Sequence, residues 1–193
     1  MKFAAALAGA LLFVLPVQAG CPDGCGRQEA PSVSTSWSGD AKAPTRLILA
    51  SPSHGYGGPL WIAIELDIAD GWYVYASTSN AAAGPALEWS GSSNLAAPVL
   101  RWPRPDTVVL DGKPTLVYHG RVVLPISVSP LQPDADIQLG LTVNYAVCGE
   151  VCRPGTAVHR VRIYAAPMPV PSAAARNAAV IADALAAAPD TPP

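Results

Sequence analysis

Several residue types that define common functional classes are scarce in this sequence. Three histidines (His54, His119 and His159) and a single methionine after the start offer few ligands for copper, or for zinc completed by histidine. There is no Gly-x-Ser-x-Gly elbow, and the His, Asp and Ser residues show no spacing typical of a catalytic triad. The glycine-rich stretch at 53–59 lacks the lysine of a phosphate-binding loop. These absences argue against hydrolase and nucleotide-binding functions.

Charge and long apolar runs are also scarce. With 12 Lys and Arg against 14 Asp and Glu, no basic surface for nucleic acid or for a membrane is expected. The one long apolar block, 3–15, follows Lys2 and precedes small residues, which predicts a secretory signal peptide over residues 1–20. We therefore expect a periplasmic chain with no membrane span once the signal is removed. Lipid attachment at Cys21 is the less favoured alternative, because Gln18 replaces the usual aliphatic residue.

The pattern after the signal divides into three parts. Residues 21–44 are rich in Gly, Pro and Ser without a sustained period, which predicts a flexible leader. Residues 45–166 hold short stretches of period two, and Asp70-Gly71 is interpreted as a hairpin turn within the clearest of them. The expected strands are 46–50, 60–68, 72–75, 86–89, 117–119, 121–128, 137–147 and 157–164. This spacing predicts an all-β fold, an antiparallel β-sandwich.

The C-terminal part, residues 167–193, has a different composition. It is rich in Ala and Pro, and its stretch from Ser172 to Ala188 predicts a short helix. Ser172 is the expected N-cap, and Pro189 is the expected stop.

Two of the four cysteines, Cys148 and Cys152, lie three residues apart at the end of an alternating apolar stretch. Export permits a disulfide between them. Closing a loop of about five residues stabilises a fold by only about 2 kcal/mol, whereas a bridge such as Cys21 to Cys152, across about 130 residues, contributes about 5 kcal/mol. The close pair therefore favours redox exchange. A structural clip, a metal site and a long-range bridge are the alternatives.

Residues beside the pair bear on its chemistry. Arg153 favours a thiolate at Cys152, while Glu150 opposes it, so the sequence leaves the thiol pKa open. The second pair, Cys21 and Cys25, lies in the expected leader. A small local disulfide is favoured there over an auxiliary dithiol or a metal site.

Three segments together resemble a known family: LDIADGWYVYA (66–76), LRWPRPDTVVLDGKPTLVYHGRVVLPISV (100–128) and LTVNYAVCGEVCRPG (141–155). In order and spacing they are similar to the N-terminal periplasmic domain of the thiol:disulfide interchange protein DsbD. They look closest to its variant in ScsB, whose cysteines are also three residues apart. The resemblance covers about Thr45 to Tyr164.

The resemblance implies an immunoglobulin-like sandwich with Cys148 and Cys152 as its catalytic pair on a hairpin. Cys152 would form the mixed disulfide with a downstream partner, and Cys148 would resolve it. Electrons would come from a membrane donor and pass to a periplasmic thioredoxin-fold protein. Because no membrane domain or thioredoxin domain follows the expected helix, we expect a free-standing copy of the domain with a separate donor.

The family also has a cap loop that shields its cysteines, and by position it falls at 106–113. Asp106, Val109 and Leu110 are the expected cap residues, although the aromatic residue of the DsbD cap is missing. Tyr118 and Tyr145 are expected near the cysteines.

The leading hypothesis is thus a periplasmic thiol:disulfide exchange domain that passes reducing equivalents through a Cys-x-x-x-Cys pair. It needs no organic cofactor, and no metal site is assigned. The alternative is a non-catalytic binding or copper-handling module whose cysteines are structural or bind metal.

Overall fold

The structure is a computed structural model that describes residues 31–76 and 84–188. The expected signal peptide and the Cys21/Cys25 pair lie outside these ranges. The strands are β1 (Thr45–Leu49), β2 (Leu60–Asp67), β3 (Tyr73–Tyr75), β4 (Ala86–Glu88), β5 (Val99–Leu100), β6 (Asp106–Leu110), β7 (Lys113–Tyr118), β8 (Arg121–Val128), β9 (Ile137–Cys148) and β10 (Cys152–Ile163). One helix, α1 (Ser172–Ala187), follows them.

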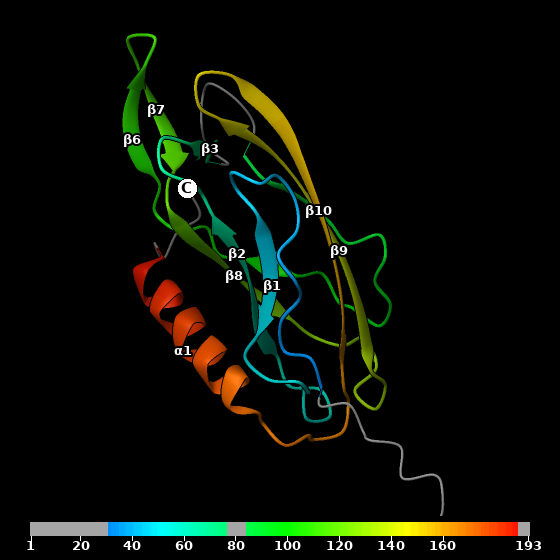
Figure 1. Cartoon of the computed structure of the whole chain (residues 1–193). Coiled ribbons are helices and arrows are strands. Elements are labelled where there is room, and N and C mark those ends of the chain that lie inside the picture. The colour runs from blue at the N-terminus through cyan, green and yellow to red at the C-terminus, as the bar shows by residue number, and fades with distance from the viewer. Residues whose placement is uncertain (1–30, 77–83, 189–193) are drawn as a thin grey trace, which may run out of the picture. The chain divides into compact units, whose positions relative to one another are not determined.

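The strands form two antiparallel sheets that pack face to face (Figure 1). The four-stranded sheet has the order β1-β2-β8-β5. The six-stranded sheet has the order β10-β9-β3-β7-β6, and β4 pairs with β9 beside this path. The expected all-β sandwich with a short C-terminal helix is confirmed.

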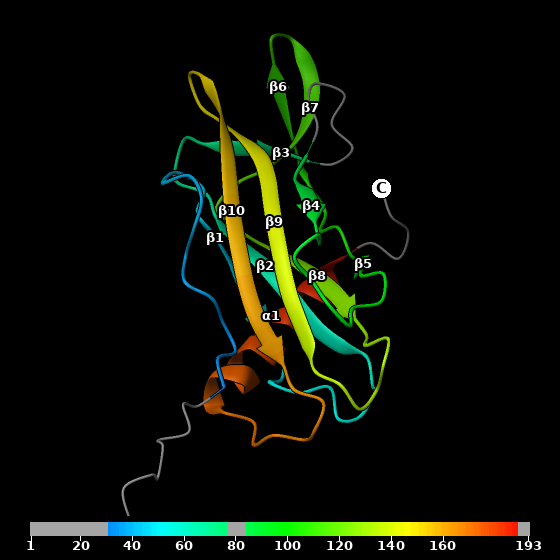
Figure 2. The same cartoon turned by 90° about the vertical axis from the view of Figure 1, so that its right-hand side faces the viewer.

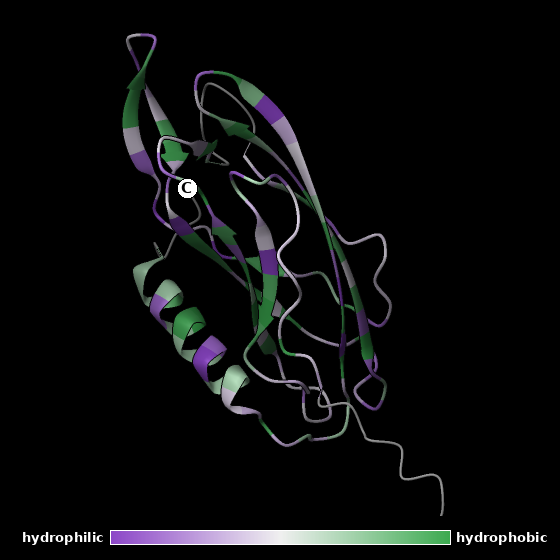
Figure 3. Ribbon diagram, in the orientation of Figure 1, coloured by the Kyte–Doolittle hydropathy of each residue, from purple (hydrophilic) through white to green (hydrophobic). Residues whose placement is uncertain are grey.

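The four-stranded sheet is buried on both faces at its centre. Alternate residues of β2, from Leu60 to Leu66, point into the main core between the sheets, as period two requires. On the other face Ile48 and Ala63 form a second cluster with Ile181 of α1. Figure 3 shows hydrophobic and hydrophilic residues alternating along α1, as expected for a helix with one face on a sheet.

The helix begins and is held differently from the prediction. Ser172 is its first helical residue, whereas Pro171 occupies the N-cap position and no side chain caps the helix, so the predicted Ser172 N-cap is wrong. The Asn177 amide instead ties α1 to the sheet, donating to the carbonyl oxygens of Val33 (2.9 Å) and Leu49 (3.1 Å). Apolar burial and this tether position the helix in place of a capping side chain.

The six-stranded sheet is built around the long β9–β10 ladder, in which twelve residues of each strand face one another from Ile137↔Ile163 to Cys148↔Cys152 (Figure 2). The return of the later strand beside the earlier one was expected from the sequence. β10 nevertheless begins five residues before the predicted start at 157, because the pairing continues to the cysteines.

Three sequence predictions about strands need correction. Asp70-Gly71 is a turn between the sheets and not a hairpin, since β2 pairs with β1 and β8 while β3 pairs with β7 and β9. β5 and β6 were not predicted. β7 begins at Lys113, four residues earlier than expected.

The described part of the expected leader is paired with the sandwich. From Pro31 the chain runs antiparallel to β1, with N–H···O bonds from Thr35 to Leu47 (2.9 Å) and from Ser38 to Thr45 (2.8 Å). Val33 is buried in the main core. The sequence did not predict this pairing because short polar residues give no period, while backbone groups can still bond to a strand edge. Among the described residues, no helix has the length and hydropathy to cross a membrane.

Candidate redox site

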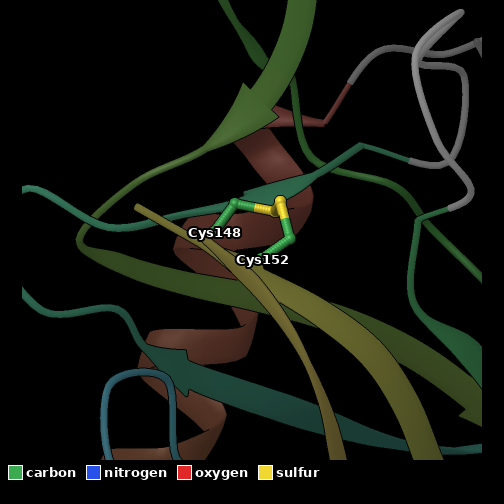
Figure 4. Close-up of a disulfide and its surroundings, with 2 residues drawn as sticks. All are labelled: Cys148 and Cys152. Atoms are coloured by element: carbon green, nitrogen blue, oxygen red, sulfur yellow. A yellow bond between two sulfur atoms is a disulfide. The ribbon is translucent and has the colours of Figure 1, made fainter. Parts of the chain in front are cut away.

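The two cysteines close the end of the β9–β10 ladder (Figure 4). Cys148 is the last residue of β9 and Cys152 is the first residue of β10, and the register places them directly opposite each other. Their Cα atoms lie 4.0 Å apart, and their sulfur atoms form a disulfide of 2.03 Å. The Gly149–Val151 loop reverses the chain, with a backbone bond of 3.2 Å from the Gly149 N–H to the Val151 carbonyl oxygen.

The two cysteines differ in exposure. Cys148 is fully buried, with 0% of its surface accessible, whereas Cys152 is exposed. Val151, which precedes Cys152 at the hairpin tip, is also exposed, at 68%. An attacking thiolate therefore has access to the bridge from the Cys152 side, since the other sulfur is covered.

The strand register identifies the neighbours that share the sheet face with Cys148. Tyr73 of β3 lies opposite Cys148, and the ring of His119, just after β7, lies 6.2 Å from the Tyr73 ring. The Nδ1 atom of His119 is 3.4 Å from the carboxylate of Asp106 in β6. These four residues form a row across the sheet from the disulfide to the β6–β7 hairpin.

Tyr73 is an uncharged neighbour of the disulfide at neutral pH. Burial, followed by a hydrogen bond with Tyr75, raises the pKa of its phenol to about 12. The two tyrosine rings meet edge to face at 5.5 Å. Tyr73 was not among the residues expected at the site, although its place in the Asp-Gly-Trp-Tyr motif was available as a signal.

The expected cap segment at 106–113 is a β-hairpin. β6 and β7 pair from Asp106↔Val117 to Leu110↔Lys113, and Asp111-Gly112 forms the two-residue turn with positive φ at both positions (49° and 76°). This geometry is typical of hairpin turns with an Asp-Gly sequence. The Asp-Gly pair could therefore have predicted the hairpin from the sequence.

The expected cap residues do not share one face of this hairpin. By register, Asp106 and Leu110 lie on the sheet face that carries Cys148, whereas Val109 points to the opposite face and is 72% exposed. In the sheet order, β3 and β7 separate β6 from β9. Both hairpins, β6–β7 and β9–β10, project at the same end of the sandwich in Figures 1 and 2.

On the opposite face of β10 from the disulfide, Arg153 forms a cluster with Asp40 and Trp72. The Arg153 guanidinium donates to both carboxylate oxygens of Asp40, from Nε at 2.7 Å and from Nη2 at 2.8 Å. The same guanidinium lies 4.5 Å from the centroid of the Trp72 ring. Its hydrogen bonds hold the pKa of the Asp40 carboxyl below its usual value. Asp40 was not singled out by sequence reasoning because it lies in the expected leader.

The two tyrosines expected near the cysteines point the other way. Tyr118 and Tyr145 are buried members of the main core, on the inner face of the six-stranded sheet. The Tyr118 hydroxyl donates to the Pro103 carbonyl oxygen (3.1 Å), and burial raises the pKa of Tyr118 to about 12. Burial also raises the pKa of Tyr145. Neither phenol shares the face of the disulfide.

Potential metal ligands bear on the alternative function. Within 31–76 and 84–188, no three His, Cys, Asp or Glu side chains gather as potential metal ligands. Cys21 and Cys25 lie outside these ranges.

Comparisons with known proteins add to this geometry. The family described as "Thiol:disulfide interchange protein DsbD, N-terminal" matches residues 48–160. The N-terminal periplasmic domain of ScsB from Proteus mirabilis is similar in structure, with a TM-score of 0.63 and 21% sequence identity. That alignment covers 82% of this chain and 60% of the ScsB chain, so this chain spans less than two thirds of that domain's length.

A second solved structure, the reduced N-terminal domain of Neisseria meningitidis DsbD, aligns at 17% identity with a TM-score of 0.37, covering 62% of this chain and 82% of that one. No curated protein matches the sequence. The likeness to ScsB supports the fold, and the family match spans more than half of the chain, including both cysteines. The chain therefore belongs to the family of DsbD N-terminal domains.

Proposed function

We propose that this chain is a periplasmic thiol:disulfide exchange domain that passes two electrons at a time through Cys148 and Cys152. The observation that carries the proposal is the unequal burial of the bridge, with Cys148 covered and Cys152 exposed. Membership of the DsbD N-terminal family supports it. A disulfide that closes a five-residue loop stabilises a fold by only about 2 kcal/mol, which also supports the proposal.

The exchange begins when a thiolate of a reduced dithiol protein attacks the Cys152 sulfur. The bond between Cys148 and Cys152 breaks, a mixed disulfide forms at Cys152, and Cys148 leaves as a thiolate that takes up a proton. The donor's second thiolate then attacks the donor sulfur of the mixed disulfide, and Cys152 is released and protonated. The chain gains two electrons and two protons, and the donor becomes a disulfide.

The reduced chain repeats these steps in the opposite sense with an oxidised partner. The Cys152 thiolate attacks the partner's disulfide, and Cys148 then attacks Cys152 to restore the bridge and release a reduced partner. We assign the role of acceptor to a periplasmic thioredoxin-fold protein, and the role of donor to a membrane protein with its own dithiol. The β6–β7 hairpin, with Asp106 and Leu110 on the disulfide face, is the proposed cap of this site.

Trapping experiments test the proposal directly. In a Cys21→Ser/Cys25→Ser background, Cys148→Ser leaves an exposed thiol with no resolving partner. It should accumulate a mixed disulfide with an oxidised thioredoxin-fold protein, visible on a non-reducing gel. The matched Cys152→Ser variant keeps only the buried thiol and should trap little. If neither variant traps a partner and the oxidised parent resists a large excess of reduced thioredoxin, the proposed function is wrong.

A further inference from the structure

The ion pair between Asp40 and Arg153 lies directly behind the redox cysteines. We propose that Asp40 is a positioning residue for the exchange: its carboxylate holds the Arg153 guanidinium against Trp72 and cancels the positive charge that would otherwise act on Cys152. This inference rests on the proposed exchange function and concerns the control of its nucleophile. It links the N-terminal segment, residues 31–44, to the chemistry of the hairpin.

The geometry of Arg153 is fixed from two sides. Both oxygens of Asp40 accept from its guanidinium, at 2.7 and 2.8 Å, and the Trp72 ring lies 4.5 Å away. The Trp72 ring also supports the redox loop, because a Cβ atom added at Gly149 would lie 3.2 Å from its atoms. Bidentate pairing and stacking together restrict a side chain that would otherwise move freely in solvent.

Asp40 is itself held in place. Its backbone N–H donates to the Tyr145 hydroxyl at 3.0 Å, and that hydroxyl donates to the Ala43 carbonyl oxygen at 2.6 Å. The Lys42 backbone N–H donates to one Asp40 carboxylate oxygen at 2.8 Å. The Asp40 side chain is only 14% exposed. The hydrogen-bonded turn at 40–43 therefore holds the Asp40 carboxylate in position to pair with Arg153.

The charge of Arg153 matters because the thiolate is the reactive form of cysteine, and a nearby cation stabilises it. Arg153 follows Cys152 directly in β10, but successive side chains of a strand point to opposite faces. The pair with Asp40 keeps the guanidinium on the face away from the sulfur and makes the local charge nearly neutral. Loss of the Asp40 charge would leave the Arg153 cation without a counter-charge next to the residue that carries the thiol.

Several other polar groups lie near Cys152 or near the Asp40–Arg153 pair. Glu150 lies in the loop, Tyr73 and Tyr75 lie on β3, and His119 lies beyond Tyr73 in the row across the sheet. The Nζ atom of Lys42 lies 6.0 Å from the centroid of the Trp72 ring. Asp111 of the β6–β7 turn acts on Tyr73. Lys42 also acts on Asp40, through its backbone N–H and its charge, but Arg153→Gln leaves Lys42 and Asp40 in place, so opposite shifts in the two variants report on the Asp40–Arg153 pair.

The test uses the full chain, reduced chemically with a phosphine, with the rate of Cys152 alkylation by iodoacetamide followed against pH by mass spectrometry. Asp40→Asn keeps the side-chain shape and removes the charge, whereas Arg153→Gln removes the cation and leaves the anion. Asp136→Asn is the matched control, because Asp136 pairs with Arg162 at the far end of the same ladder (2.7 Å from Nε). Thermal unfolding of each variant checks that it is folded.

The two changes should act in opposite directions. At a pH below the thiol pKa, we expect Asp40→Asn to react about threefold faster and Arg153→Gln about threefold slower, which corresponds to about half a pKa unit each way. The double variant should react at about the parental rate, as should Asp136→Asn. High salt should reduce both shifts, because partly exposed charges are screened.

Shifts of the same sign in both single variants would overturn the proposal, since they would mean that the pair only stiffens the hairpin. Rates unchanged in both variants would overturn it as well. If Asp40→Asn proves too unstable to assay, Arg153→Gln alone still decides the sign. Alkylation of chemically reduced protein needs no protein partner, so a failure here is separate from a failure of the proposed exchange, which the trapping experiment measures.

Discussion

The two sheets of the sandwich use their ion pairs differently. In the four-stranded sheet, the carboxylate of Glu65 is fully buried and pairs with Arg46 and with Arg121, whose Nε lies 3.0 Å away. At the end of the six-stranded sheet, the Asp40 carboxylate is 14% exposed and pairs with a single arginine, Arg153. The first arrangement belongs to a scaffold that is covered on both faces. The second lies on the hairpin of Cys152, where we propose that charge acts on the sulfur.

This contrast predicts that changes in the four-stranded sheet reduce stability without altering the chemistry. Leu124 of β8 is fully buried in the main core. Leu124→Ala should lower the free energy of unfolding by about 3 kcal/mol, the cost of lost burial plus a cavity. Denaturant titration measures the loss, and the half-exposed Val158→Ala is the control. A changed alkylation rate of Cys152 in the folded variant would contradict the separation of the two sheets.

The buried pair should be the next most sensitive feature. Glu65→Gln leaves Arg46 and Arg121 without a counter-charge, and we expect a loss of about 2 kcal/mol, because both arginines are partly exposed and regain water. Asp40→Asn is the comparison variant and should cost much less stability while changing Cys152 reactivity. Equal stability losses in both variants would remove the distinction between the fully buried Glu65 carboxylate and the partly exposed Asp40 carboxylate.

Reduction of the disulfide should have a similar or smaller effect. The bridge closes a very short loop, so its loss should cost at most about 2 kcal/mol, and the reduced chain should stay folded. Unfolding curves of the oxidised and phosphine-reduced chains, with far-ultraviolet circular dichroism, measure this difference. A chain that unfolds on reduction would show a structural staple and would weaken the exchange proposal.

Tyr145→Phe should have a smaller effect that reaches the redox hairpin. It removes the hydroxyl that bonds to the Ala43 carbonyl oxygen and to the Asp40 N–H, for a loss of about 1 kcal/mol. Because Asp40 is then less firmly held, Cys152 alkylation should shift in the direction of Asp40→Asn. Tyr118→Phe, which loses a hydroxyl bond to Pro103, is the matched control and should leave the alkylation rate unchanged.

The stability of the fold should depend on pH through His159, which links the two sheets. His159 of β10 is buried between the hydroxyls of Thr35 and Thr45, each 2.9 Å from a ring nitrogen, and burial lowers its pKa. The unfolded chain therefore binds a proton at this residue more readily than the folded chain. Stability should be full above about pH 6.5 and should fall as the pH decreases from there through the folded pKa. His159→Gln should flatten this part of the stability curve, and an unaltered curve would contradict it.

Local patterns predicted the long elements well. The alternation in β9 and the Ala-rich composition of α1 are visible in the chain, and both elements form where they were expected. A bridge between Cys148 and Cys152 was also considered from their spacing, and it is present, while its role in redox exchange stays a prediction. β6 was missed although Asp111-Gly112 is a turn signal, since the segment was interpreted as a loop.

The partners of the site could not be predicted in the same way. Asp40 lies 113 residues from Arg153 along the chain, within a stretch that has no period. Tyr73 and Cys148 face each other only because β3 joins the other sheet and does not fold back on β2. Such contacts depend on which strands pair, and pairing is set by the burial of whole faces and not by neighbouring residues.

Alternation and composition are therefore enough to predict the sandwich class and the terminal helix, and spacing makes Cys148 and Cys152 a candidate pair. The long-range packing determines the rest: which sulfur is covered, which face carries the disulfide, and which carboxylate lies behind Cys152. The physical reason is that a period of two identifies the two faces of a strand but not what packs against each face. The partner strands, chosen by apolar burial across the whole chain, determine what each face meets.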